Sequence, residues 1–217
     1  MTNKLFQMKP IKMGNGFYIK PITDFEDFSK VIDVFKEWPF DEPLTLEDKK
    51  EEYNGYLKNG LCLGFYHNTG DIMGLAGLMH EVEEEHEEYF APQAGKLNPF
   101  YIYGLATLPE YRGHGVCTTL MEVIHDIALE NNIDFIYLRT QLEGSMSEGL
   151  CRKLGYTDMC QNSKKIVQTV TFERGTTGEI GSDDRQFLIY PISEEGKEIL
   201  VETGAIVPEK SKVKKLS

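Results

Sequence analysis

The chain has 217 residues, 41% of them hydrophobic, and a formal net charge of −12 at pH 7. This length and apolar content suit one domain with its own core over residues 1–217. The acidic balance argues against a nucleic-acid partner, because neutralising phosphates requires a basic surface. The acidity is compatible with a cationic substrate, and it is equally compatible with a role in solubility alone.

Neither a membrane nor an oxidising compartment is indicated. No apolar run reaches the roughly 18 residues of a membrane span, and residues 1–14 lack the apolar segment of a secretory signal. The four cysteines (Cys62, Cys117, Cys151 and Cys160) form no C-x-x-C pair or regular framework. We therefore expect a cytoplasmic protein with reduced cysteines.

The first half of the chain predicts two helices and four strands. Residues 17–22 alternate as a short strand, and 24–37 form a helix that is capped by Asp24 and ends at Trp38, before Pro39. A more polar helix is expected from Leu44 to Leu57. Strands over 61–67 and 72–79 form a hairpin. The strand over 100–107 is apolar on both faces, which favours a central position in the sheet.

The second half alternates helices and strands. Apolar residues recur at helical spacing after Gly115, residues 134–139 predict a strand, and 145–154 predict a helix closed by Gly155. Strands near 165–173 and 186–191 are expected to complete the sheet, and a short helix near 193–202 precedes a flexible, lysine-bearing tail over 207–217. This order predicts a mixed, mostly antiparallel α/β sheet covered by helices on both faces.

The loop between the central strand and the next helix has the features of an anion site. Two glycines permit unusual backbone angles and a close approach by a ligand. The first turn of the helix offers unpaired N–H groups and a positive dipole end, and Arg112 adds charge. A glycine-rich turn of this kind can also be only a turn.

The run IYGLATLPEYRGHGV, with the helix behind it and the later LCRKLGY, resembles the core of the GCN5-related N-acetyltransferases (GNAT) over roughly residues 99–156. The family signature R/Q-x-x-G-x-G/A falls on Arg112, Gly115 and Cys117. The resemblance implies the GNAT fold, acetyl-CoA as co-substrate, and backbone amides that bind its pyrophosphate. The residues implied in cofactor binding are Leu105, Ala106 and Thr107 along the strand, and Arg112, Gly113, His114, Gly115, Val116, Cys117 and Thr118 at the loop and helix start.

The sequence departs from the family pattern at two positions. Cys117 stands where Gly or Ala is usual, and a small thiol fits there as a modest hydrophobe. Cys151 stands where many relatives have the tyrosine that protonates the departing CoA thiolate. Cys151 is therefore a candidate acid, but a packing role is favoured because its reach is short.

The resemblance also implies chemistry that other residues must supply. An amine must lose a proton before it attacks the thioester, and the central strand from Phe100 to Thr107 holds no acidic residue. Glu81, just beyond the 72–79 strand, is our candidate base. The glutamates of 81–88 are otherwise read as a solvated segment, and the spacing of His80, Glu84 and His86 matches no metal-ligand motif, so no metal is expected.

In the family, the connection between the first two helices borders the acceptor site. Here residues 36–44 carry Trp38, Phe40, Asp41 and Glu42, whose aromatic faces and carboxylates suit a cation. Trp38 and Phe40 are equally consistent with core packing.

We expect an acetyl-CoA-dependent N-acetyltransferase acting on a primary amine of a small molecule or a protein. A non-catalytic acyl-CoA binding or sensing module is the alternative, because the family tyrosine and a strand carboxylate are missing. A nucleotide-phosphate binder of another fold is weaker still. The sequence leaves the oligomeric state open, a homodimer included.

Overall fold

The computed structural model describes residues 8–33, 45–80, 97–141, 146–159, 168–171, 177–180 and 185–206. Its main feature is an eight-stranded sheet in the order β1-β2-β3-β4-β5-β6-β10-β7. Neighbouring strands are antiparallel except β5 and β6, which run parallel. The strands are β1 (Ile11–Lys12), β2 (Phe17–Pro21), β3 (Gly60–His67), β4 (Ile72–Met79), β5 (Pro99–Thr107), β6 (Phe135–Gln141), β7 (Thr157–Asp158) and β10 (Arg185–Pro191).

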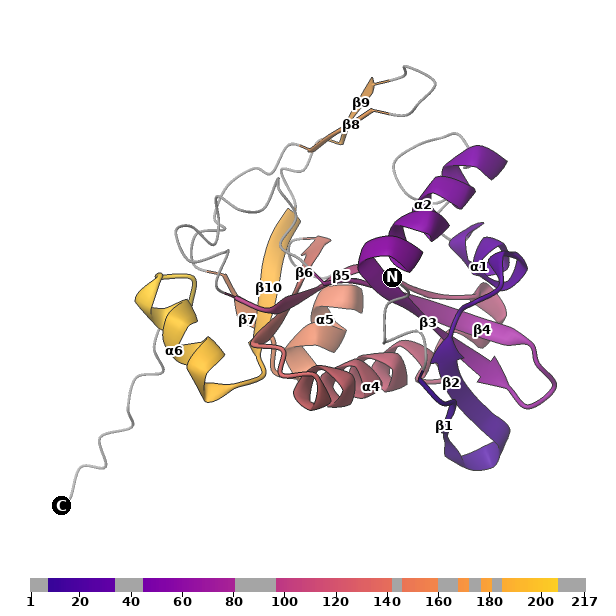
Figure 1. Ribbon diagram of the computed structural model, residues 1–217, viewed down its shortest axis with the longest axis horizontal. Coiled ribbons are helices and arrows are strands. Elements are labelled where there is room, and N and C mark those ends of the chain that lie inside the picture. Colours follow the sequence, from indigo (N-terminus) through magenta and orange to yellow (C-terminus); the bar gives the residue numbers. More distant parts are fainter. Residues whose placement is uncertain are drawn as a thin grey trace.

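Helices cover both faces of this sheet (Figure 1). On one face, α1 (Phe25–Ile32) packs on β4 and β5, α2 (Leu46–Asn59) packs on β3 and β4, and α6 (Glu194–Glu202) packs on β10. On the other face lie α4 (Val116–Glu130) and α5 (Met146–Lys153), the first of which packs across β3 to β6. Two short 3-10 helices, η2 (Gly14–Gly16) and η6 (Pro109–Tyr111), complete the described elements of the main body.

The buried side chains form clusters that follow these two faces. Leu120 and Ile124 of α4 pack with Ile102 and Leu138 of the sheet. On the opposite face, Phe28 of α1 belongs to a cluster with Tyr56 of α2, and a third cluster lies under α6. Burying both faces explains why the central strands read as continuous apolar runs in the sequence.

Most predicted elements are present, and the fold class is confirmed. The start of α2 was placed two residues too early, because the capping box of Thr45 and Asp48 sets the first turn. Helix α1 is capped by Asp24 as expected but ends at Ile32, with Asp33 as its C-cap. The predicted end at Trp38 lies outside the described residues, as does the tail over 207–217.

The strand expected near 165–173 does not join the main sheet. Strand β8 (Gln168–Thr171) pairs instead with β9 (Thr177–Ile180) in a separate two-stranded sheet. The sequence of β8, QTVT, has a single large apolar side chain and offers no apolar face to bury. The short β7 pairs with β10 and forms that edge of the main sheet.

Candidate functional site

The two parallel strands at the middle of the sheet separate before they end. β5 and β6 pair over four residues, from Pro99 and Phe135 to Ile102 and Leu138. Beyond this point β5 stays paired with β4 as far as Thr107, and β6 stays paired with β10 as far as Gln141. The carboxyl-terminal halves of β5 and β6 therefore border an opening within the sheet, which we call the strand split.

A bulge in β5 lies where the strand split begins. In the β4–β5 ladder Gly77 is opposite Gly104 while Leu78 is opposite Ile102, so Tyr103 is the extra residue. The bulge reverses the alternation of side chains. Tyr101 contacts Tyr103 on the face of α1, α2 and α6, whereas Leu105 packs in the α4 cluster.

Backbone groups of β5 point into the strand split. Leu108 N–H donates to Met73 O at 2.9 Å, which makes this a hydrogen-bonded pair of the antiparallel ladder. Because such pairs alternate along the strand, Ala106 bonds to β4, and the N–H groups of Leu105 and Thr107 point toward the side that β6 has left. The sheet thus presents two backbone donors at the strand split.

The loop after β5 and the first turn of α4 form a largely exposed surface. Gly113 and Gly115 adopt left-handed backbone angles, with φ of 79° and 80°, and no atom lies within 4 Å of where a Cβ would stand on either. Gly115 is the N-cap of α4 and gives no side-chain cap, and the first turn of α4 has no acidic residue. The first N–H groups of α4 therefore remain available to an anion.

Two side-chain contacts hold this loop. Thr107 Oγ1 lies 3.0 Å from Cys117 Sγ, which joins the end of β5 to the first turn of α4. His114 Nδ1 donates to the backbone oxygen of Arg112 at 3.0 Å. Burial raises the pKa of the Cys117 thiol, while the Thr107 hydrogen bond and the Arg112 charge oppose this in part. The thiol is therefore uncharged at neutral pH and does not repel an anion.

Cys151 lies on α5 within the core. Its side chain is 1% exposed and belongs to the cluster beneath α4. Burial raises the pKa of its thiol to about 11. These observations agree with the packing role that we favoured for this residue.

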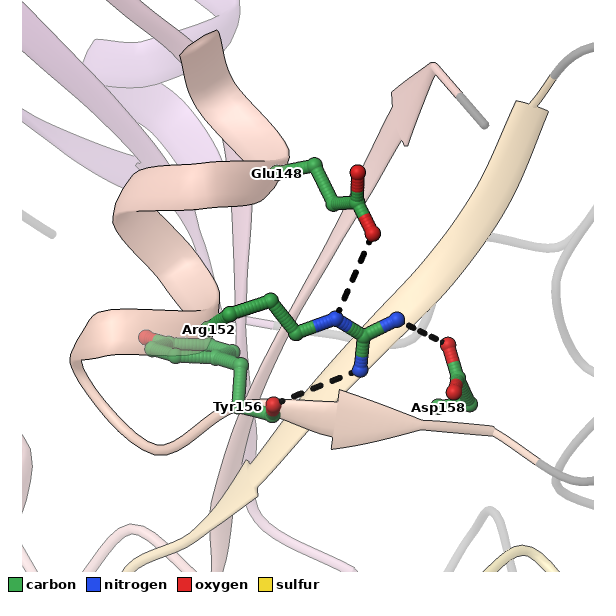
Figure 2. Close-up of polar contacts among 4 residues, drawn as sticks. All are labelled: Glu148, Arg152, Tyr156 and Asp158. Atoms are coloured by element: carbon green, nitrogen blue, oxygen red, sulfur yellow. Dashed lines mark hydrogen bonds and ion pairs between the residues drawn. The ribbon is translucent and has the colours of Figure 1, made fainter. Parts of the chain in front are cut away.

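An arginine in the same helix fastens α5 to the sheet (Figure 2). Arg152 Nε donates to Glu148 Oε1 at 3.4 Å, Nη1 donates to the backbone oxygen of Tyr156 at 3.5 Å, and Nη2 pairs with the Asp158 carboxylate of β7. The charge of Arg152 is matched by two carboxylates, which indicates a structural role.

The face opposite α4 carries aromatic side chains at the strand split. Tyr101 stacks on Tyr137 with ring centroids 4.6 Å apart, and Tyr103 meets Tyr56 of α2 edge-on at 6.1 Å. Burial, followed by the charge of Glu52 on α2, raises the pKa of Tyr56 well above its ordinary value. Glu52 is therefore a carboxylate near the strand split that the polar sequence of α2 did not single out.

Several predicted site residues cannot be placed. Glu81 and the residues Trp38, Phe40, Asp41 and Glu42 lie outside the described residues, as do Glu84 and His86. The predicted cofactor residues are all described, and they come together at the end of β5, the loop and the start of α4. Among the described residues, no group of His, Cys, Asp or Glu could hold a metal ion.

A cavity of about 610 Å³ lies on the other side of the α4 start. Its walls come from β2, β3 and β4 together with the loop and first turn of α4, and they include Phe17, Phe65, His67 and His114. It is mainly apolar. None of the described helices is both long and apolar enough to cross a membrane.

Comparison with known proteins assigns the family. The model of the acetyltransferase (GNAT) family matches residues 27–156, which is more than half of the chain. This chain belongs to the GNAT acetyltransferase family. The match includes β5, the loop, α4 and the LCRKLGY segment at the end of α5 and just beyond it, so the family resemblance seen in the sequence is confirmed.

Solved structures of GNAT-like proteins share the fold at low identity. The ribosomal-protein-S18-alanine N-acetyltransferase of Escherichia coli is 14% identical, with a TM-score of 0.53 over 82% of this chain and 94% of that one. The Salmonella typhimurium protein YncA, solved with acetyl-CoA, is 16% identical, with a TM-score of 0.56 over 83% and 96% of the two chains. No curated protein matches the chain at a significant level.

Proposed function

We propose that this GNAT protein transfers the acetyl group of acetyl-CoA to a primary amine. The observation that carries the proposal is the strand split, where the backbone donors of Leu105 and Thr107 adjoin the open first turn of α4. An extended amide-bearing chain can bond to such a strand edge, while a phosphate group suits a helix N-terminus. Acetyl-CoA carries both groups.

The pyrophosphate of acetyl-CoA would lie against the loop from Arg112 to Thr118. The positive φ values of Gly113 and Gly115 and the open space above them allow backbone N–H groups to approach a phosphate closely. Arg112, Gly113, His114, Gly115, Val116, Cys117 and Thr118 are the proposed contacts, with Leu105, Ala106 and Thr107 along the pantetheine arm. The YncA structure, which was solved with acetyl-CoA on the same fold, supports acetyl-CoA as the ligand.

The transfer itself needs three groups. The amine nitrogen attacks the thioester carbonyl carbon, a C–N bond forms, the C–S bond breaks, and the amine loses a proton. One of the two β5 N–H groups, of Leu105 or of Thr107, would stabilise the negative charge that develops on the carbonyl oxygen, and the other would bond to the pantetheine arm. Glu81 remains our proposed base, and Trp38, Phe40, Asp41 and Glu42 remain the proposed acceptor contacts.

Cys151 is a poor candidate for protonating the leaving thiolate. Its thiol has a pKa of about 11, whereas an ordinary thiol has a pKa near 8.5, so the proton transfer would be uphill by roughly 3 kcal/mol. We propose that the CoA thiolate leaves without help from this residue. The same observation favours the second candidate function, an acyl-CoA sensor without turnover.

One experiment separates the two functions. Acetyl-CoA is mixed with the protein and a panel of amines, and free CoA thiol is measured over time, with calorimetry of acetyl-CoA binding as the parallel readout. Thiol release that depends on a particular amine identifies an enzyme. Tight binding without release across the panel would favour the sensor, and absence of binding would overturn both.

A further inference from the structure

A positively charged side chain stands at the strand split on the face opposite α4. Arg139 follows Leu138, the last residue of β6 that pairs with β5. Side chains alternate along a strand, so Arg139 shares its face with Tyr137 and Phe135, whereas Leu138 packs in the α4 cluster. On β5 the corresponding position beyond the paired segment is Tyr103, which is 39% exposed.

One nitrogen of the Arg139 guanidinium is unsatisfied within the described part of the chain, on a side chain that is partly exposed overall. Its Nε atom is buried, and no hydrogen-bond partner meets it. Arginine stays protonated in proteins and is costly to remove from water without an acceptor. Arg152 shows the contrasting case in this chain, with two carboxylates and a carbonyl around its guanidinium (Figure 2).

The surroundings of Arg139 suit a ligand better than a structural partner. Its neighbour across the sheet in β10 is Phe187, and the preceding residue on its face, Tyr137, is stacked on Tyr101. These rings supply apolar walls, and Glu52 of α2, the carboxylate near the strand split, makes no hydrogen bond to Arg139 Nε. A planar carboxylate on a ligand would accept two parallel hydrogen bonds from the Arg139 guanidinium.

We infer that Arg139 binds the carboxylate of the acceptor, and that the acceptor is an α-amino acid. The inference rests on the proposed N-acetyltransferase function. In an α-amino acid one carbon separates the amine from the carboxylate, so a carboxylate on Arg139 holds the amine at the strand split. The backbone donors of Leu105 and Thr107 border the same split from β5. The products are an N-acetylamino acid, CoA and a proton.

The test compares amino acids with their primary amides, which keep the amine and lose the carboxylate charge. Binding to the CoA-saturated protein is measured by calorimetry for wild type, Arg139→Gln, Arg139→Lys and a control. The control is Lys12→Gln, which removes one exposed positive charge from β1 at the far edge of the sheet. KM and kcat are then measured by thiol release.

We expect at least one amino acid to bind wild type about tenfold or more tightly than its amide. The amide lacks the carboxylate charge and therefore loses the charge-assisted hydrogen bonds to Arg139. Arg139→Gln should abolish this preference by weakening the acid and sparing the amide, and should raise KM more than it lowers kcat. Arg139→Lys should restore part of the preference, because an ammonium lacks the bidentate geometry. Lys12→Gln should keep the wild-type ratio.

The failures are distinguishable. If no amino acid binds the wild-type CoA complex, or if Arg139→Gln keeps the wild-type ratio of acid to amide, the inference about Arg139 is wrong. If an amino acid binds through Arg139 but no thiol is released, the proposed transferase function is wrong and the inference on binding stands. If Arg139→Gln does not fold, Arg139→Lys takes its place. The ratio of amino-acid to amide affinity is then compared between wild type and Arg139→Lys, and an unchanged ratio contradicts the inference.

Discussion

Replacing Gly115 by Asp and by Asn tests the proposed phosphate site with a difference of one charge. Both side chains are the same size, and no atom lies within 4 Å of where a Cβ would stand at this position, so neither meets a steric clash. Both must adopt the φ of 80° of the native glycine. The backbone strain is about 1–2 kcal/mol for an L-residue, and Asn and Asp tolerate this region better than most.

The charge of Asp should act mainly on the ligand. At about 6 Å and an effective dielectric constant of about 20–80, each pair of like unit charges costs about 0.7–2.8 kcal/mol. Facing a pyrophosphate, the introduced aspartate should therefore raise the Kd of acetyl-CoA by at least about tenfold relative to the Asn variant. In the ligand-free protein, a negative charge at the start of α4 is favourable, which offsets part of the strain.

The assay is the ligand-induced rise of the thermal midpoint, with calorimetric Kd values alongside. At a ligand concentration of 100 times the wild-type Kd, acetyl-CoA adds about 2.7 kcal/mol to the free energy of unfolding. A tenfold weaker Kd reduces this to about 1.4 kcal/mol, and each kcal/mol corresponds to about 2–4 °C for a chain of this size. Equal Kd values for folded Gly115→Asp and Gly115→Asn would refute the reasoning that the α4 start binds the phosphates.

Three further predictions address the acid, the acceptor and pH. Cys151→Ser should keep most activity and Cys151→Ala should lower kcat less than about tenfold, since an essential acid costs about 100-fold or more; a larger loss at unchanged acetyl-CoA affinity and midpoint would make the thiol the acid. Asp41→Asn with Glu42→Gln should raise KM for a cationic amine at constant acetyl-CoA Kd, and equal weakening of both substrates would count against this loop. His125 Nε2 lies 3.0 Å from Tyr156 Oη, and burial lowers the pKa of His125. The unfolded chain therefore takes up a proton at this residue near pH 6.5, whereas the folded protein does so only at lower pH. The contribution of His125 to the free energy of unfolding is thus fully present above about pH 6.5 and falls as the pH drops below it. His125→Gln should make the urea unfolding midpoint depend less on pH between about pH 7 and 5. An unchanged pH dependence would exclude His125 as its source.

The sequence was sufficient where local signals determine the structure. The positive-φ glycines 113 and 115, the uncapped start of α4 and the αL residue Gly155 after α5 all depend on a few neighbouring residues, and the sequence identified each. The hairpin of β3 and β4 is equally local. These features also carry the family resemblance, so the cofactor side of the site could be proposed from the sequence.

The proposed role of Arg139 could not be predicted, because it depends on which strands meet. The bulge at Tyr103 is defined by the register of β5 against β4, and the glycine next to it, Gly104, is its only sign in FYIYGLAT. Arg139 ends an apolar strand pattern in the sequence, and its proximity to the strand split follows from the point where β5 and β6 part. A charged residue in an otherwise buried strand was the available signal.

The strand split also bears on how the molecule folds. Strands β1 to β5 form a meander in which each strand pairs with the next along the chain, whereas β6, β7 and β10 pair only among themselves and, over four residues, with β5. The meander can therefore assemble from contacts close in sequence while the rest of the chain is still being synthesised. The later strands then dock through the short ladder of β5 and β6 and through α4, which packs on strands of both groups. The proposed binding site is the seam between an early and a late part of the same sheet.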